Sequence, residues 1–455
     1  MKSVNITIIG AGSAQFSGGL IRDLCVTPNL HDSTVTLMDV DKKRLAFVLA
    51  MGQKLCAEMG VPMKFRSTAD LAEALTGADF VINTAQDQGH GWYEAQRDIG
   101  ERNGYYRGGM LGQIYQTAFL LETARSIERY CPNALLIQSS NPVFEGCTVI
   151  HRQTGVNFVG LCHGHYGYRE VADVLGLERE HVTAKACGFN HWIWMTDFRY
   201  RGENAYPLLD RWIEEKAEEY WRKPRKYNDQ QMSRAAIRQY QMLGLMPIGD
   251  TPRMLETPSM MGWFFTKTLE DRKYWYSQQG GFDSEEGWAQ YLRDLDVKTA
   301  QIAHVATDST VKITDVFEPI QSDEQIVPII ESIAYDIPRT FQVNIPNRGH
   351  LVEGYPEDIV VECQAVVSGS GIQGIHSGKL PSKVIAGAMN PRFIQCELVS
   401  EAIISGDLDA FKLLFLLDHE TKSLVQVEQL LREWIGDPRN RCIRNLIKGG
   451  EAAWK

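Results

Sequence analysis

The sequence predicts an α/β protein in which a Rossmann-type, doubly wound parallel sheet packs against a mixed α/β C-terminal domain. Two observations support this prediction. The β-branched apolar run of residues 4–9 ends directly in glycines. Strand-like and helix-like segments then alternate up to about residue 164. A different pattern begins near residue 196, so we expect a first domain over residues 1–195 and an α+β domain over residues 196–455.

The composition narrows the classes of function. The 455 residues carry a net charge of −10 without any Lys/Arg-rich run, so nucleic acid is not an expected partner. No apolar run approaches the length of a membrane span, and the short start favours a first strand over a signal peptide. The nine cysteines contain no CxxC pair, which favours a reducing, cytoplasmic location.

The segment VNITIIGAGSAQF at residues 4–16 joins the first strand to a predicted helix at residues 17–28. A second apolar strand ends on Asp39, which lies 27 residues after Gly12 (39 − 12). Such a unit binds a mononucleotide: Gly12 lets the backbone approach a pyrophosphate, and the acid accepts hydrogen bonds from ribose hydroxyls. We therefore expect NAD rather than NADP, bound at Gly10, Gly12, Ser13, Phe16 and Asp39.

Further α/β elements follow in order. They are a strand at 64–68, a helix at 70–78, a strand at 79–85, a helix at 118–131 and strands at 134–143 and 157–164. Ligands of an open parallel sheet bind at the carboxyl ends of its strands. We therefore expect Asn83, Asn141, Cys162 and His163 to face one crevice, with Asn83 and Asn141 at the cofactor.

The segment CHGHYG at residues 162–167 allows three interpretations of Cys162. A nucleophile needs a base, but the adjacent His163 would point to the other face of a strand. A buried thiol that only packs is common. A metal ligand needs a partner, and His191 is a candidate because strand alternation would place it on one face with Ile193 and Met195.

Together with other segments, CHGHYG resembles glycoside hydrolase family 4, the NAD- and manganese-dependent glycosidases, and its α-glucosidase-like branch in particular. The resemblance runs from the first strand to beyond residue 360. The matching segments are GAGSAQF, TVTLMDVD, ADFVINTA, GYYRG, NPVFEG, CHGHYG, GFNHWIW, NAYPLLDRWIEEK, MPIGDTPR, VNIPNRG and EDIVVE.

The resemblance implies a redox-elimination reaction. NAD takes a hydride from C3 of the sugar, which acidifies the proton on C2. A divalent metal, Mn²⁺ or another transition metal, holds the C2 and C3 oxygens while a base removes that proton and the leaving group departs. Water then adds, and the hydride returns to C3.

The resemblance also implies roles for single residues. Cys162 and His191 match the metal ligands. His163 matches the acid that protonates the leaving group, and Asp250 matches the base of the α-glucosidase branch. A turn-capping aspartate is the alternative for Asp250. The residues expected at the sugar are Asn141, His163, Arg107 and Arg253.

Two departures from the family pattern bear on the sugar. Where the phosphoglycosidase branches have Asn, this chain has His163, which disfavours a phosphorylated sugar. After GYYRG the chain reads GMLGQIYQ, without the acids of the α-glucosidase branch. Either the sugar carries a C6 carboxylate or sulfonate that Arg107 or Arg253 binds, or this loop was simply rebuilt.

The later segments have simpler patterns. An amphipathic helix is expected at 206–221, strands at 339–349 and 357–367, and a helical pair at 393–418 that Gly406 interrupts. The aromatic residues of 262–288 fit a protein core better than a sugar site. We expect the active site between the two domains.

The predicted function is hydrolysis of gluco-configured α-glycosides. The alternatives are an α-glycosidase for an anionic sugar (a glucuronide, galacturonide or sulfoquinovoside), an α-galactosidase, and an NAD-dependent 2-hydroxy-acid dehydrogenase. The expected partners are a small α-glycoside and further copies of the chain in a homodimer or homotetramer, without nucleic acid or membrane.

Overall fold

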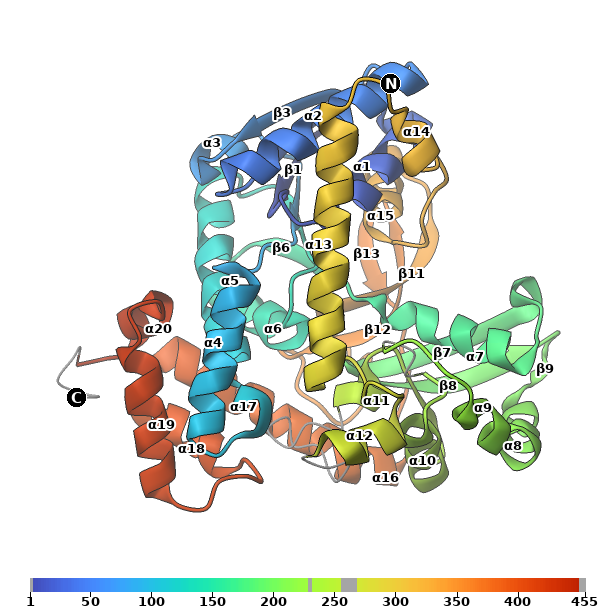
Figure 1. Ribbon diagram of the computed structural model, residues 1–455, viewed down its shortest axis with the longest axis vertical. Helices are drawn as coiled ribbons and strands as arrows, with labels where there is room; N and C mark the ends of the chain where they lie inside the picture. The colour runs from blue at the N-terminus through green and yellow to red at the C-terminus, as the bar shows by residue number, and fades with distance from the viewer. Residues whose placement is uncertain (1–2, 228–230, 255–267, 450–455) are drawn as a thin grey trace.

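The computed structural model describes residues 3–227, 231–254 and 268–449. They form one α/β unit around a single 13-stranded sheet (Figure 1), whose main path runs β10-β8-β7-β12-β11-β6-β5-β4-β1-β2-β3. Within the described residues no helix is long and apolar enough to cross a membrane.

The first half of the sheet is parallel, in the order β3-β2-β1-β4-β5-β6. This is the Rossmann order, so the predicted fold class is confirmed. The strands are β1 (Asn5–Ile9), β2 (Thr34–Met38), β3 (Lys64–Thr68), β4 (Phe80–Asn83), β5 (Leu135–Gln138) and β6 (Asn157–Gly160). The helices between and after them are α1 (Ser17–Cys25), α2 (Lys42–Met59), α3 (Leu71–Leu75), α4 (Gly89–Arg102), α5 (Leu111–Tyr130), α6 (Val143–Gln153) and α7 (Gly167–Leu175).

The second half of the sheet is antiparallel. Its strands are β7 (Val182–Phe189), β8 (Trp192–Tyr200), β9 (Glu203–Asn204), β10 (Met246–Ile248), β11 (Arg339–Pro346), β12 (Val360–Ser368) and β13 (Gly371–Gly374). The helices are α8 (Tyr206–Glu215), α9 (Ala217–Arg222), α10 (Arg234–Leu243), α11 (Thr251–Met254), α12 (Leu269–Trp275), α13 (Glu285–Thr307), α14 (Ile313–Val316), α15 (Ile326–Tyr335), α16 (Ser382–Val384), α17 (Asn390–Ser405), α18 (Leu408–Leu416), α19 (Leu424–Gly436) and α20 (Arg441–Leu446). Of these later helices, α15 packs on strand β12, whereas α13, α14, α19 and α20 pack on helices of the parallel half. The predicted helix of residues 206–221 is two helices that meet at Lys216.

The two halves of the sheet meet where β6 pairs with β11. Gly160 lies opposite Asn344 at this joint. A Cβ on Gly160 would lie 2.7 Å from Val143 Cγ1 and 2.9 Å from Asn344 Cβ, so only glycine fits between the strand and its covering helix. The joint makes one continuous sheet of two segments that are distant in the sequence, and a domain boundary at residue 195 stays a prediction.

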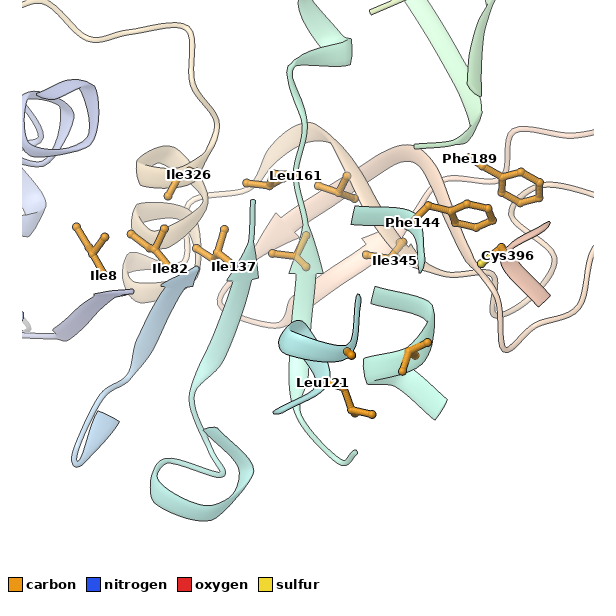
Figure 2. Packing of buried hydrophobic residues seen from close by; sticks show 14 of the residues in the cluster. Ile8, Ile82, Leu121, Ile137, Phe144, Leu161, Phe189, Ile326, Ile345 and Cys396 are labelled. Atoms are coloured by element: carbon orange, nitrogen blue, oxygen red, sulfur yellow. The ribbon is translucent and has the colours of Figure 1, made fainter. Parts of the chain in front are cut away.

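The apolar core is continuous across this joint (Figure 2). One buried cluster extends from Ile8 in β1 through Ile137 in β5 to Cys396 in α17. Toward its Cys396 end the rings of Phe144 and Phe189 stack with centroids 4.4 Å apart. Helix α6 of the parallel half and strand β7 of the antiparallel half are therefore packed directly on each other.

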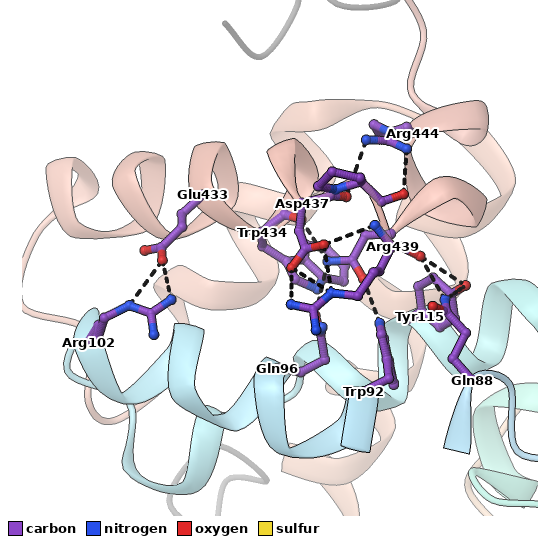
Figure 3. Close-up of polar contacts among 12 residues, drawn as sticks. Gln88, Trp92, Gln96, Arg102, Tyr115, Glu433, Trp434, Asp437, Arg439 and Arg444 are labelled. Carbon is purple, nitrogen blue, oxygen red and sulfur yellow. Dashed lines mark hydrogen bonds and ion pairs between the residues drawn. The ribbon is translucent and has the colours of Figure 1, made fainter. Parts of the chain in front are cut away.

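The last helices hold α4 from outside (Figure 3). The indole nitrogen of Trp92 donates to Asn440 Oδ1 over 3.0 Å. At the start of α4, Gln88 Nε2 donates to the carbonyl of Arg439 over 2.7 Å, and at its end Arg102 pairs with Glu433. Because both ends of α4 are tied down, its inward-facing side chains have fixed positions.

Glu362 in β12 is a carboxyl group buried inside the sheet. It is 1% exposed and pairs with Gly188 of β7. Burial raises its pKa to about 7, and the charge of Asp250 acts in the same direction, while hydrogen bonds such as that from Asn190 Nδ2 at 2.9 Å oppose the rise. The folded protein therefore favours the protonated acid.

We predict that Glu362→Gln stabilises the protein relative to the wild type by an amount that grows as pH rises from about 4.5 to about 7, and that it has no such effect at lower pH. Between the ordinary pKa of 4.5 and about 7, the unfolded chain ionises at this residue while the folded chain keeps the proton. The free energy of unfolding of the wild type should therefore fall by about 3 kcal/mol as pH rises through this window. Urea unfolding at pH 5 and pH 8 would measure the effect. The exposed Glu318→Gln is the control, and an equal effect of Glu362→Gln at both pH values would contradict the prediction.

Candidate functional site

The glycine turn after β1 has the geometry of a nucleotide site. Gly10 has a φ of 81°, and a Cβ there would lie 2.6 Å from Ala85 Cα. The Gly12 amide donates to Asp39 Oδ2 over 2.7 Å, and a Cβ on Gly12 would lie 2.8 Å from the same oxygen. Phe16 is the last residue before α1. The turn therefore brings glycine backbone and the N-terminus of α1 together beside Asp39, the arrangement that binds the pyrophosphate of a dinucleotide.

Asn83 is not at the crevice where the sequence analysis expected it. Its side chain is fully buried, with Nδ2 donating to Gln138 Oε1 over 2.9 Å and Oδ1 accepting from the Ala85 amide over 3.1 Å. It joins the ends of β4 and β5 below the crevice. The following Thr84 and the more distant Asn141 line the cavity instead.

A cavity of about 470 Å³ opens beside the carboxyl ends of the parallel strands. Both halves of the sheet and the helices that follow supply its wall. Of the predicted site residues, it is lined by Phe16, Arg107, Asn141, His191, Asp250 and Arg253. Cys162 lines a small adjoining recess, which shares Phe16 and Asn141 with the main cavity.

Three potential metal ligands converge at this wall. Cys162 Sγ lies 3.2 Å from His191 Nε2, which lies 3.1 Å from Asp250 Oδ2. Their ligand atoms all lie within 4.8 Å of one another, and they are the one such group that the described part of the chain contains. A thiolate, an imidazole and a carboxylate fit a borderline divalent metal and leave coordination positions for a ligand.

Two tight turns present the metal-site residues. Cys162 extends beyond the end of β6. His191 lies in the turn between β7 and β8 with a φ of 62°, so the predicted strand alternation with Ile193 and Met195 is wrong for this residue. The turn is tight because Gly188 has a φ of 151° and a Cβ there would lie 2.0 Å from the Trp192 carbonyl oxygen.

Asp250 is positioned by the residue after it. The Ile193 amide donates to Thr251 Oγ1 over 2.8 Å, and the same hydroxyl donates to the Ile193 carbonyl over 3.1 Å. These bonds fasten the start of α11 to β8. They keep the carboxylate of Asp250 beside His191.

The electrostatics favour a neutral imidazole. Burial lowers the pKa of His191 to about 4, and although the Asp250 charge raises it, Arg253 and Arg392 lower it further. The ring is therefore uncharged at neutral pH and can offer a nitrogen lone pair to a metal. The positive partner of Asp250 is Arg253, whose Nη2 lies 3.1 Å from Asp250 Oδ2.

The side chain of His163, to which the sequence assigned the role of an acid, lies outside the described structure. A short 3₁₀ turn spans His163–Tyr166 and directly follows Cys162. The placement of the His163 side chain is not described. Its role as an acid stays a prediction.

Several residues of the wall were missed by the sequence analysis. Arg97 and Asp283 come from segments without a recognisable motif, and Asp283 Oδ2 lies 3.4 Å from Arg253 Nε. Glu145 and Arg392 form a buried ion pair at the wall. Glu145 lies in the segment NPVFEG and Asp283 in the aromatic-rich segment 262–288, but no pattern in the sequence pointed to any of the four as a wall residue.

Comparisons with known proteins agree with this geometry. Residues 5–177 match the sequence profile "Family 4 glycosyl hydrolase", and residues 186–421 match the profile of its C-terminal domain. An α-glucosidase of Erwinia rhapontici is 27% identical over 458 residues, which cover 94% of this chain and 96% of the relative. An α-galacturonidase of Lachnoclostridium phytofermentans is 24% identical, with 96% of each chain covered.

Among solved structures, the fold resembles a 6-phospho-α-glucosidase from gut microorganisms in complex with NAD and Mn²⁺. The TM-score is 0.78 at 19% identity, and the alignment covers 95% of this chain and 98% of the other. The two profile matches together span most of the sequence. The chain therefore belongs to glycosyl hydrolase family 4, the NAD-dependent glycoside hydrolases.

Proposed function

We propose that this glycoside hydrolase cleaves gluco-configured α-glycosides by C3 oxidation, C2 deprotonation, elimination, water addition and re-reduction at C3. One observation carries the proposal: the Cys162–His191–Asp250 group and the ends of the nucleotide-binding strands line adjoining parts of one crevice. Family membership contradicts the alternative of a 2-hydroxy-acid dehydrogenase. The α-galactosides remain alternative substrates.

The nucleotide turn would hold the cofactor. Gly10, Gly12 and Ser13 would offer backbone N–H groups to the pyrophosphate, and Asp39 would offer its carboxylate to a ribose. Bound NAD supplies a hydride acceptor that is regenerated within each turnover. Phe16 and Asn141 line the cavity and would orient the nicotinamide end of the cofactor.

The thiolate of Cys162 and the neutral ring of His191 would hold a divalent metal, Mn²⁺ or another transition metal. A metal in this position polarises the sugar oxygens that it binds. Asp250 would take the C2 proton, and His163 would give a proton to the leaving oxygen. Arg253 balances the charge of Asp250 and, with Asn141, would contact the sugar hydroxyls.

The relatives support the α configuration of the substrate. Those named above are an α-glucosidase and an α-galacturonidase, so both act on α-linked sugars, although they differ in the sugar. A homodimer or homotetramer remains the assembly that we expect.

Cys162→Ser should abolish turnover and weaken metal binding at least about 100-fold, because a serine hydroxyl is a poor replacement for a thiolate ligand. Titration calorimetry with Mn²⁺ would measure the change in metal affinity directly. Cys131→Ser, which replaces a buried thiol at the end of α5, is the matched control. Wild-type metal affinity in Cys162→Ser would exclude Cys162 as a ligand.

Turnover in D₂O tests the reaction type. The holoenzyme with NAD and Mn²⁺ is given a panel of neutral and anionic α- and β-glycosides, and the released sugar is examined by NMR. We expect deuterium at C2, NAD that is not consumed, and loss of activity with a chelator. Release of sugar without NAD or metal would exclude the redox-elimination mechanism.

A further inference from the structure

Asn190 lies beside the metal-site histidine and was not singled out by the sequence analysis. Phe189 of β7 pairs with Trp192 of β8, so the loop of this hairpin consists only of Asn190 and His191. Asn190 lines the cavity, although it is only 3% exposed. A two-residue hairpin loop has little conformational freedom, so the fold presents this side chain to the cavity in a defined position.

One end of the Asn190 amide is bound to the buried carboxyl group of Glu362. Asn190 Nδ2 donates to Glu362 Oε2 over 2.9 Å. The second oxygen is also enclosed, because a Cβ on Gly164 would lie 3.1 Å from Glu362 Oε1. Gly164 follows Cys162 by two residues, and Asn190 precedes His191 directly. Glu362 therefore lies close to both turns that carry the metal-site residues, and the packing leaves its carboxyl group little room to rotate.

The surroundings of Glu362 select one orientation of the Asn190 amide. Side-chain hydrogen bonds from Asn190, Asn344 and Gln342 each lower the pKa of Glu362 against the larger effect of burial, so all three support the ionised form. An ionised carboxylate only accepts hydrogen bonds, and it therefore requires the N–H side of the amide to face it. At pH 8, above the Glu362 pKa of about 7, this form predominates.

The other end of the amide, Asn190 Oδ1, has no hydrogen-bond partner among the residues that the structure describes. With its nitrogen on Glu362, a planar amide has its oxygen on the side away from that carboxyl group. An amide oxygen in a largely buried wall is stabilised by a donor and cannot itself donate. The ligand group that fits this position is therefore a neutral hydroxyl, which can supply a hydrogen.

We propose that Asn190 binds the sugar, with Oδ1 accepting a hydrogen bond from one of its hydroxyl groups, and that Glu362 is the positioning residue that holds this oxygen toward the cavity. The nature of the ligand, a sugar, rests on the proposed function. Because Asn190 adjoins His191, the hydroxyl is one that lies close to the metal-site residues. An anionic group in the same place would meet the partial negative charge of the amide oxygen and find no donor there.

The test measures sugar binding by titration calorimetry at pH 8 on the enzyme saturated with NAD and Mn²⁺. The probes are glucose, galactose, glucuronate and galacturonate, and the one that the wild type binds most tightly is then used for every variant. Asn190→Ala should weaken its binding about tenfold, while the affinities for Mn²⁺ and NAD change less than about threefold. Asn133→Ala, in the exposed turn before β5, is the control and should change none of the three affinities.

An exchange of the two side chains tests the role of Glu362. Asn190→Asp alone should weaken sugar binding at least about tenfold, because two carboxylates then face each other. In the double variant Asn190→Asp/Glu362→Gln, the new amide can donate to the new carboxylate, whose second oxygen remains an acceptor toward the cavity. We expect this variant to recover sugar affinity to within about threefold of the wild type, a coupling that two independent residues would not show.

Four results would overturn the proposal. They are a wild type that binds none of the four sugars, an unchanged sugar affinity in Asn190→Ala, a double variant that binds no better than Asn190→Asp, and a fall in Mn²⁺ or NAD affinity that accounts for the loss. Thermal unfolding of each variant separates misfolding from a binding defect, and the double variant, which retains the hydrogen bond, is the milder change. Because sugar binding is measured without turnover, a missing deuterium label at C2 would reject the reaction mechanism and leave this comparison intact.

Discussion

The pairing of β6 with β11 is the constraint on which the rest of the molecule depends. It attaches an antiparallel sheet to a nucleotide-binding one, and the metal-site residues lie just beyond the strands concerned. Cys162 is two residues past Gly160, which faces β11, and His191 is three residues past Gly188, which faces β12. The distance between sulfur and imidazole is therefore set by the register of strands and not by flexible loops. Sites built on such elements are held with the precision that positioned chemistry needs.

Burial decides the chemistry of the groups around that joint. It keeps the imidazole of His191 neutral and so suited to a metal, and it raises the pKa of the Glu362 carboxyl group to about 7. Asp250 Oδ2 lies 3.1 Å from His191 Nε2 and 3.1 Å from Arg253 Nη2. The fold therefore fixes the charges of these groups before a ligand enters the cavity. Less reorganisation of the protein is then needed during the reaction.

The parallel half of the fold was predictable because all of its strands except the edge strand β3 are largely apolar and end in or just before glycine or a polar residue. The glycine turn, Asp39 and the helix end at Gly406 follow from backbone chemistry that the sequence displays locally. The site was only partly predictable. Strand alternation gave the wrong conformation for His191, because this residue lies in the hairpin turn before β8 and not in the strand itself. Asn83 ends a strand as expected, but its side chain forms hydrogen bonds to Gln138 and Ala85 beneath the crevice. Arg97, Asp283 and Arg392 reach the wall through packing between distant segments, for which the sequence carries no local signal, and Asp250 was found by family resemblance alone.

The joint between the two halves also has a consequence in time. Asn344 and Gly160 are 184 residues apart, so at ribosomal speed about 10 to 40 s pass between the synthesis of the two strands. During that interval the nucleotide-binding half has its strands but lacks the neighbours that complete its edge. The reaction centre therefore cannot be complete until the chain has been synthesised well past its nucleotide-binding half, and until then the edge of β6 lacks its partner strand.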